Sequence, residues 1–259
     1  MKKTLITPDT NDFPSEFRSL ITGNIFDSSC SREARVYYLA DRRLFLKKAP
    51  LGSLKAEAEM AGYFGSIGLG AEVISYVSDE YDWLLTNEVK GEDLTHEIYT
   101  SRPEFIAERI GVALKMLHSL PIDNCPIQNR TETYLSNAEY GYKNKRYDET
   151  LFPDNWGYAS PEEAWRVIEK RGCELECNTL LHGDYCLPNV IFDGDSFSGF
   201  IDIGNGGIGD RHIDLFWGAW TLWFNLKTDK YKDIFFDAYG RSGIDFDRFS
   251  LIAACEVFG

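Results

Sequence analysis

The chain has 259 residues, of which 44% are hydrophobic, enough to bury a substantial core in one large domain or two lobes. Its 41 acidic residues against 27 basic ones give a formal net charge of -14 at pH 7, which argues against a nucleic-acid-binding protein. A cationic small-molecule partner fits this charge better, although acidic proteins also use charge for solubility alone.

Cysteine usage and hydropathy bear on the compartment. Six cysteines occur without a Cys-x-x-Cys pair and with only four histidines, so a zinc site has few ligands to draw on. The start, MKKTLITPDTND, has no apolar core of a signal peptide, and the longest apolar-rich stretch, IDLFWGAWTLWFNL, is too short for a membrane span and contains Asp214. We therefore expect buried, reduced thiols and a cytoplasmic protein with no membrane partner.

The first third of the chain predicts a small sheet with one helix. Residues 34–40 and 43–49 have strand composition around a DRR turn, and residues 71–77 and 81–89 predict two further strands. Between these pairs, Ser53 is a candidate N-cap for an alanine-rich helix over 54–66. The segment KGEDL then loosens the chain, so we place the end of the first lobe at residue 89.

The remainder, residues 90–259, reads as mainly helical. Ser101 and Glu104 form a capping-box pattern before a helical apolar repeat, and Ser160 and Glu163 repeat the pattern before a helix that Gly172 ends. Short strands and a DGD turn are expected between NTLLHGD and FSGFID. The sequence thus predicts an α+β protein with an N-terminal sheet lobe over 1–89 and a larger helical lobe over 90–259.

The stretch LLHGDYCLPNVIFDGDSFSGFIDIGNGG places polar groups at the ends of short apolar runs. Phosphoryl transfer needs metal ligands, a cation on the phosphates, and a carboxylate that receives the proton of the acceptor hydroxyl. Asp184 suits the last task, and Asn189 and Asp202 offer the oxygen ligands that Mg²⁺ prefers. His182 is expected to order the loop by hydrogen bonding rather than to titrate.

HGDYCLPN followed by IDIGNGGIGDRHIDL resembles the active-site motifs of the aminoglycoside phosphotransferases, most of all the aminoglycoside 3′-phosphotransferases. The segments ARVYYLADRRLFLKK, WLLTNEVKGEDL, LKMLHSLPIDNCP and the ending CEVF also resemble family segments in the same order, so the resemblance covers nearly the whole chain. It implies a two-lobed protein-kinase-like fold, with a nucleotide-binding N-terminal lobe and a catalytic, acceptor-binding C-terminal lobe.

The resemblance also implies roles for individual residues. Asp184 corresponds to the catalytic base, Asn189 and Asp202 to the Mg²⁺ ligands, and Lys47 to the lysine on the ATP phosphates, with Lys48 as its neighbour. Further nucleotide-site residues follow from position in the family pattern: Glu57 pairs with the lysine, with Glu59 as a competitor, Ser31 or Ser29 lies over the phosphates, and Glu88 and Val89 meet adenine through backbone groups. Asp210 and Asp214 are expected to cap a helix or brace a loop.

The resemblance also implies that the C-terminus and an acidic segment bind the acceptor. Glu256, Phe258 and Glu163 are the implied acceptor-binding residues. The chain departs from the family pattern where Asn205 replaces a common arginine, where Cys255 replaces an acidic residue, and where Gly259 extends the ending.

We therefore expect an enzyme that uses ATP and Mg²⁺ to phosphorylate a hydroxyl, the 3′-hydroxyl by resemblance, of a cationic aminoglycoside antibiotic and so confers resistance. We expect a monomer or weak dimer with no nucleic-acid partner. Two alternatives stay open at this point: a kinase of another small alcohol, such as choline or a macrolide, and a nucleotide-binding pseudokinase.

Overall fold

The structure is a computed structural model that describes residues 3–30, 33–147 and 157–259. The chain forms two compact units: unit 1 comprises Met1–His96 with Pro188–Gly204, and unit 2 comprises Glu97–Leu187 with Asn205–Gly259. This division differs from the expected one after Val89. The short strand β7 (Glu92–Asp93) pairs with β9 (Val190–Asp193), which ties both segments to unit 1.

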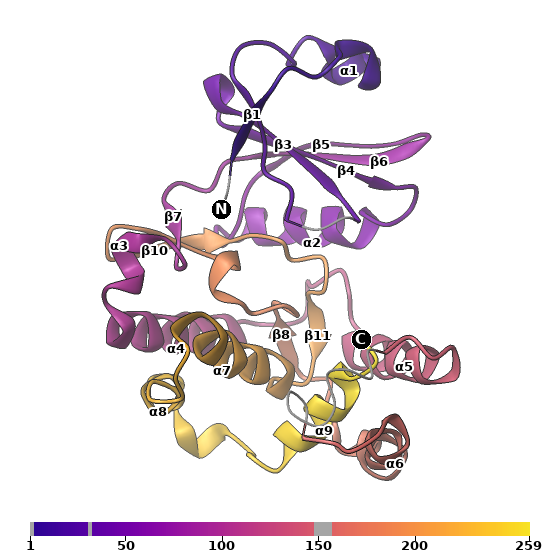
Figure 1. Cartoon of the computed structure of the whole chain (residues 1–259), viewed down its shortest axis with the longest axis vertical. Helices are drawn as coiled ribbons and strands as arrows, with labels where there is room; N and C mark the ends of the chain where they lie inside the picture. Colours follow the sequence, from indigo (N-terminus) through magenta and orange to yellow (C-terminus); the bar gives the residue numbers. More distant parts are fainter. Residues whose placement is uncertain (1–2, 31–32, 148–156) are drawn as a thin grey trace. The chain divides into compact units, whose positions relative to one another are not determined.

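Unit 1 contains a six-stranded antiparallel sheet in the order β1-β2-β3-β4-β6-β5 (Figure 1). The predicted strands over 34–40, 43–49, 71–77 and 81–89 are all present, as their content of β-branched and aromatic residues predicts. Strand bounds are β1 Thr4–Ile6, β2 Ile25–Asp27, β3 Arg35–Leu39, β4 Leu44–Pro50, β5 Val73–Ser78 and β6 Tyr81–Asn87.

The two faces of this sheet have separate cores. On one face Leu46, Trp83 and Leu85 pack with Phe13 and with Phe17 of α1 (Ser15–Arg18). On the other face, residues one step along the same strands pack near α2 (Lys55–Ser66), in a cluster of Ala49, Leu54 and Leu84 with Ala58, Val73 and Tyr76. The period of two along β4 and β6 therefore decides which side chains meet α2.

The start of α2 is not capped as the sequence predicts. The Ser53 hydroxyl donates to the carbonyl of Pro50 at 2.6 Å and leaves the helix start uncapped. Asp82 from β6, fully buried, instead accepts the backbone N–H of Leu54 at 2.9 Å. A carboxylate from a neighbouring strand replaces the local cap because it supplies charge as well as an acceptor at the helix start.

Unit 1 also contains a three-stranded sheet in the order β10-β9-β7, with β10 over Ser196–Phe200. The β9–β10 hairpin corresponds to the predicted strands around the DGD turn. It brings Asn189, just before β9, and Asp202, just after β10, into the same unit as the large sheet.

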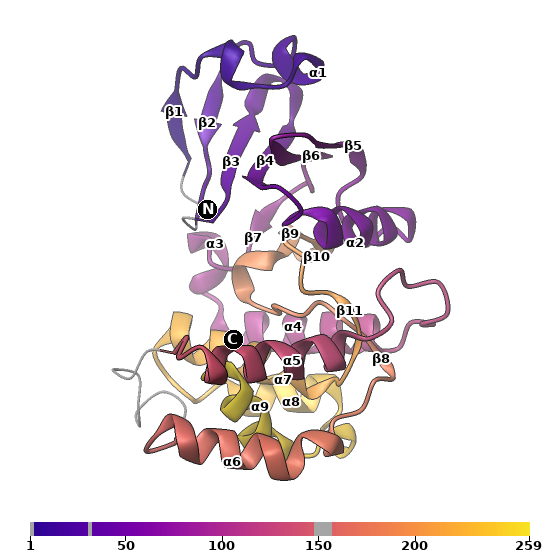
Figure 2. The ribbon, with the colours of Figure 1, turned by 90° about the vertical axis from the view of Figure 1, so that its right-hand side faces the viewer.

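Unit 2 is mainly helical and includes the short antiparallel pair β8 (Thr179–Leu181) and β11 (Gly207–Gly209). Helix α9 lies between α5 and α6, and the C-terminus lies beside α5 (Figures 1 and 2). The core between these helices includes Ala138, Ile168, Ala254 and Phe258. Helix bounds are α3 Glu97–Thr100, α4 Pro103–His118, α5 Arg130–Lys143, α6 Pro161–Arg171, α7 His212–Leu226, α8 Lys232–Tyr239 and α9 Arg248–Glu256.

The two predicted capping boxes differ in outcome. Ser160 accepts the backbone N–H of Glu163 at 3.2 Å, while the Glu163 carboxylate accepts the N–H of Ala159 at 2.8 Å, so the box at α6 is confirmed. The prediction at α4 is wrong, because Arg102 occupies the N-cap position and the Ser101 hydroxyl donates to Ile98 instead. α3 ends directly before Ser101, so the Ser101 hydroxyl bonds to a carbonyl of α3 instead of capping α4.

The cysteines of the chain are free thiols. Cys125 and Cys255 are buried as expected, whereas Cys30, Cys173 and Cys177 are exposed. In the part of the chain that the structure describes, no helix has both the length and the apolar character to span a membrane.

Candidate active site

An ion triad in unit 1 joins three of the predicted residues. Lys47 alternates with Leu46 on β4, so it faces α2, where its Nζ lies 2.9 and 2.8 Å from the two carboxylate oxygens of Glu57. The same Nζ lies 2.7 Å from Asp202 Oδ1. Burial alone would lower the pKa of Lys47, but the charges of Glu57 and Asp202 outweigh burial and raise it. The ammonium is therefore fixed between two carboxylates.

Asp202 and Asn189, the two predicted Mg²⁺ ligands, lie in chain segments that a backbone hydrogen bond joins. Asp202 has a φ of 57°, in the left-handed region that residues other than glycine seldom adopt. The carbonyl of Asn189 accepts the N–H of Ile201 at 3.0 Å, which connects the two chain segments. An amide and a carboxylate suit hard Mg²⁺, and the ammonium on Asp202 shows that this carboxylate accommodates a cation. Residues 3–30, 33–147 and 157–259 contain no cluster of three or more His, Cys, Asp or Glu side chains suited to a metal.

In unit 2, the His182–Asp184 loop is held from the first turn of α7. The buried carboxylate of Asp214 accepts the N–H groups of His182 and Gly183, each at 2.7 Å. His182 is itself buried, and its Nδ1 accepts the N–H of Asp184 at 3.3 Å. Gly183 has a φ of 85°, and a Cβ there would lie 1.9 Å from the carbonyl oxygen of Asn205. The loop backbone is thus specified on both sides, which fits the bracing role expected for Asp214.

A cavity of about 320 Å³ adjoins this loop within unit 2. Its walls come from α5, the Asp184 loop, α7 and the C-terminus. The lining residues are Arg130, Tyr134, Asn137, Gly183, Asp184, Asn205, Ile213, Trp217, Cys255, Glu256 and Gly259. Two acidic residues, Asp184 and Glu256, therefore line the same cavity.

The Glu256 carboxylate is held by hydrogen bonds from two surrounding side chains. Its Oε1 accepts the Tyr134 hydroxyl at 2.7 Å and the Trp217 indole N–H at 3.0 Å. Burial raises the pKa of Glu256 to about 7; the hydrogen bonds from Tyr134 and Trp217 oppose this rise, and the charge of Asp184 adds to it. Near neutral pH, Glu256 can therefore be converted to its anion at small cost.

The sequence did not predict five of the cavity residues: Arg130, Tyr134, Asn137, Ile213 and Trp217. Arg130 and Tyr134 are one helical turn apart on α5, with Asn137 next on the same face. This spacing was visible in the sequence, but no helix was predicted over 130–143. The Arg130 Nε donates to the carbonyl of Gly206 at 2.9 Å and so connects the start of α5 to the segment entering β11.

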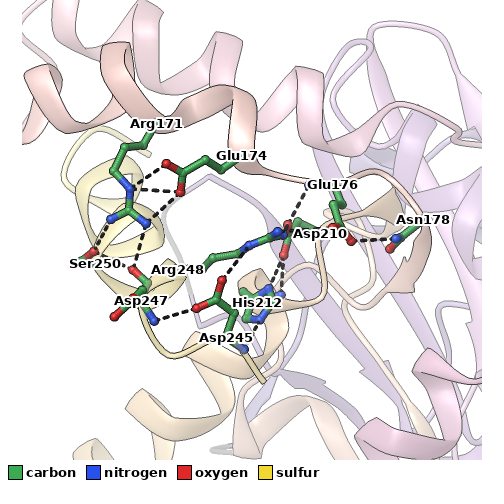
Figure 3. Close-up of polar contacts among 10 residues, drawn as sticks. All are labelled: Arg171, Glu174, Glu176, Asn178, Asp210, His212, Asp245, Asp247, Arg248 and Ser250. Atoms are coloured by element: carbon green, nitrogen blue, oxygen red, sulfur yellow. Dashed lines mark hydrogen bonds and ion pairs between the residues drawn. The ribbon is translucent and has the colours of Figure 1, made fainter. Parts of the chain in front are cut away.

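A buried polar network in unit 2 anchors the other end of β11 (Figure 3). Asp210 accepts the N–H groups of His212 and Glu176 at 2.8 and 2.7 Å and forms a 2.7 Å ion pair with Arg248. Burial would raise the pKa of Asp210, but the hydrogen bonds from His212 and Glu176 prevail and lower it to about 2. His212 Nε2 in turn accepts the N–H of Asp245 at 3.0 Å. Asp210 therefore joins the starts of α7 and α9, a bracing role as expected.

Comparison with known proteins places this geometry in a family. Residues 31–252 match the sequence pattern of the family described as "Phosphotransferase enzyme family". A protein of Lactococcus lactis named "Probable aminoglycoside 3′-phosphotransferase" is 44% identical over 252 residues, 95% of each chain. An aminoglycoside 3′-phosphotransferase of Niallia circulans is 30% identical over 82% of this chain and 84% of its own. The chain belongs to the aminoglycoside phosphotransferase family.

Solved structures of aminoglycoside phosphotransferases agree on the fold. An aminoglycoside 3′-phosphotransferase of type VIII aligns with a TM-score of 0.73 at 22% identity, over 90% of this chain and 91% of its own. A 3″-phosphotransferase of Streptomyces rimosus aligns with a TM-score of 0.72 at 24% identity, over 89% and 92% of the two chains. The predicted α+β, protein-kinase-like fold is confirmed.

Within this aminoglycoside phosphotransferase, the residues predicted to meet adenine lie just after β6. The N–H of Glu88 donates to the carbonyl of Arg43 at 2.9 Å, and its carboxylate accepts Arg43 Nε at 2.8 Å. Val89 packs against Gly199, where a Cβ would come within 3.1 Å of Val89 Cγ1. Ser31 lies outside the described residues, and the Ser29 hydroxyl accepts the N–H of Val36 at 2.9 Å.

Two of the predicted acceptor-binding residues do not line the cavity. Glu163 is exposed and its carboxylate is used in the capping box at α6. The side chain of Phe258 is 4% exposed and packs edge-on against Tyr142 and Trp165 in the core. Gly259 lines the cavity at this end of the chain, so the extra residue, rather than Phe258, occupies the place next to Glu256.

Proposed function

We propose that this aminoglycoside phosphotransferase transfers the γ-phosphate of ATP to a hydroxyl of an aminoglycoside, the 3′-hydroxyl by the names of its relatives. The observation that carries the proposal is the cavity in unit 2, where Asp184 and Glu256 face the same space. One carboxylate can receive the hydroxyl proton while the other binds an ammonium group of the same molecule. A neutral alcohol acceptor would need only the carboxylate that receives the proton.

Asp184 acts as the base in this proposal. Its side chain lines the cavity, and its backbone N–H is held by His182, so the carboxylate can be presented to an acceptor hydroxyl. Asp184 accepts the hydroxyl proton as the acceptor oxygen attacks the γ-phosphorus. The bond between that phosphorus and the oxygen bridging to the β-phosphate breaks, and ADP leaves. His182 orders the loop and does not exchange this proton.

The nucleotide residues belong to unit 1. Lys47, charged and held by Glu57, supplies the cation for the α- and β-phosphates. The N–H of Glu88 already donates to the carbonyl of Arg43, so the carbonyl of Glu88 and the backbone of Val89 are the groups proposed to contact adenine. Asn189 and Asp202 would hold Mg²⁺. When bound, the ion neutralises charge on the transferred phosphoryl group. Ser31 is proposed to touch the phosphates by its place in the sequence alone.

Glu256 is proposed to bind an acceptor amine. Its pKa of about 7 means that an ammonium group can convert it fully to the anion on binding. Tyr134 and Trp217 fix the carboxylate through Oε1 and leave its other oxygen for the ligand. Acceptor roles for Phe258 and Glu163 have less support, because Phe258 is buried in the core and Glu163 caps α6.

Phosphorylation would protect a cell, because the added negative charge weakens an aminoglycoside that binds RNA phosphates as a cation. We propose a cytoplasmic protein, monomeric or weakly dimeric, with no nucleic-acid partner. Its acidic composition supports the last point.

A coupled ADP-release assay with Mg²⁺ and ATP tests the function. The purified chain is offered aminoglycosides, choline and macrolides in parallel. Turnover with aminoglycosides is expected, and chelation of Mg²⁺ should abolish it. Turnover restricted to choline or a macrolide would contradict the proposal, as would tight binding of Mg²⁺ and ATP without turnover on any alcohol, the behaviour of a pseudokinase.

A further inference from the structure

A row of aromatic side chains follows one face of α7 away from the cavity. Ile213 and Trp217, which line the cavity, are followed on the same helical face by Trp220 and Phe224, at steps of four, three and four residues. Ring centroids of Trp217 and Trp220 are 5.3 Å apart, and those of Trp220 and Phe224 are 4.7 Å apart with nearly parallel planes, at 11°. Ring contacts therefore run from Trp217 to Phe224 without a gap within unit 2.

The outer end of this row is unusually exposed for large apolar side chains. Phe224 is 45% exposed and the neighbouring Trp223 is 38% exposed. Singly exposed aromatic residues need no explanation, but a stacked row that starts inside a ligand cavity points to a ligand. Core packing does not account for Phe224, because almost half of its surface stays in contact with solvent.

The size of the cavity points to what lies beyond it. At about 320 Å³, it is at the lower end of the roughly 300–1,000 Å³ typical of cavities that enclose whole ligands. An acceptor that carries three or four sugar rings must extend past its mouth. Trp217 lines the cavity and its ring contacts Trp220, so additional rings that leave the cavity on this side would meet Trp220 and Phe224.

The chemistry of the row also matches an aminosugar. Aromatic faces attract the C–H faces of sugar rings and cations such as ammonium groups. The ammonium of the exposed Lys227 lies 4.2 Å from the ring centroid of Phe224, so this ring attracts a cation, and an acceptor ammonium group would take the place of the Lys227 side chain. We propose that Trp220 and Phe224 form an outer acceptor subsite that stacks against the sugar rings of a multi-ring aminoglycoside outside the cavity. This inference rests on the proposed function of the cavity.

Steady-state kinetics of Phe224→Ala tests the subsite, because this exposed side chain can be removed with little effect on folding. At saturating ATP, KM is measured for a two-ring and a four-ring aminoglycoside. We expect KM for the four-ring acceptor to rise roughly 3- to 10-fold, with kcat, KM for ATP and KM for the two-ring acceptor unchanged. Phe224→Tyr, which keeps the ring, should restore the wild-type KM.

Phe246→Ala is the matched control, since Phe246 is also an exposed aromatic residue of unit 2, at 42%, but lies outside the row. It should leave both KM values unchanged. Equal shifts for the two-ring and four-ring acceptors, or no shift for either, would overturn the subsite while the proposed function stands. A dimer that Phe224→Ala dissociates in sedimentation experiments, without ring-dependent KM changes, would assign the row to a second copy and also overturn it. Absence of aminoglycoside turnover in the wild-type chain would overturn both proposals.

Discussion

The ammonium of Lys47 and the carboxylate of Asp202, 155 residues apart in the chain, form an ion pair of 2.7 Å in unit 1. Lys48, the next residue, points to the other face of the sheet, where its ammonium lies 3.9 Å from the ring centroid of Tyr81. From the sequence, either lysine could be the one on the ATP phosphates, but the alternation of side chains along β4 points only Lys47 toward Glu57 and Asp202.

Lys47→Met should lower kcat by about 10²–10³-fold, because a fixed positive charge is removed from the phosphates. KM for ATP should rise, whereas KM for the acceptor should change little. Lys48→Met is the matched control and should retain activity. Equal losses in the two variants, measured by coupled ADP release, would contradict the assignment of Lys47.

The pKa of about 7 for Glu256 predicts a pH-dependent acceptor affinity. Below this pH the carboxyl group is protonated and neutral, so KM for an aminoglycoside should fall about tenfold as pH rises from about 6 to 8. Glu256→Gln keeps an acceptor for Tyr134 and Trp217 but removes the charge, so its KM should be high and show no such step. Glu163→Gln should follow the wild-type profile; loss of the step there instead would move the amine-binding role to Glu163.

The raised pKa of Glu256 also makes the free energy of unfolding depend on pH. A pKa raised above the ordinary value of 4.5 means that the folded state binds the proton more tightly than the unfolded state. Stability from this group is complete below about pH 4.5 and is lost as pH rises through 7. The loss should be ~1–3 kcal/mol in free energy of unfolding, because cavity water screens part of the charge. Urea unfolding of Glu256→Gln should show a smaller decline over the same range.

The pH dependence of stability that Asp210 contributes is opposite in sign to that of Glu256. Its pKa, lowered to about 2, gives stability that is present above the ordinary value of 3.8 and is lost as pH falls towards 2. Asp210→Asn should destabilise the protein by about 2–4 kcal/mol, since Arg248 loses its buried partner. Thermal unfolding should show the change. Asp237→Asn, which breaks the exposed pair with Arg241, is the control; a comparable loss there would contradict a special role for Asp210.

Strands β3 to β6 of the large sheet could be predicted because their composition is a property of the local sequence. Strands β1 and β2 were not predicted, since each is only three residues long. The starts of α2 and α4 could not be predicted, since Asp82 reaches Leu54 from a strand 28 residues away and α3 ends where a cap for α4 was expected. Local Ser and Glu patterns indicate a helix start only where no tertiary contact competes, as at Ser160 and Glu163.

The candidate site likewise contains residues that local motifs predict and residues that only tertiary packing brings together. The motifs around Asp184, Asn189 and Asp202 are contiguous in the sequence and were recognisable there. The setting of Glu256 was not, because Tyr134 and Trp217 lie 122 and 39 residues from it and meet it only through the packing of α5 and α7 on α9.

Product analysis of the wild-type chain beside Asp184→Asn tests the central claim most directly. After incubation with Mg²⁺, ATP and an aminoglycoside, ADP is quantified and the product is examined by mass spectrometry and by phosphorus NMR. We predict one phosphate per aminoglycoside, attached at the 3′ position and formed in equal amount to ADP. Asp184→Asn should form it ~10²–10⁴-fold more slowly with unchanged ATP affinity. An unmodified aminoglycoside, or wild-type rates in Asp184→Asn, would contradict the account.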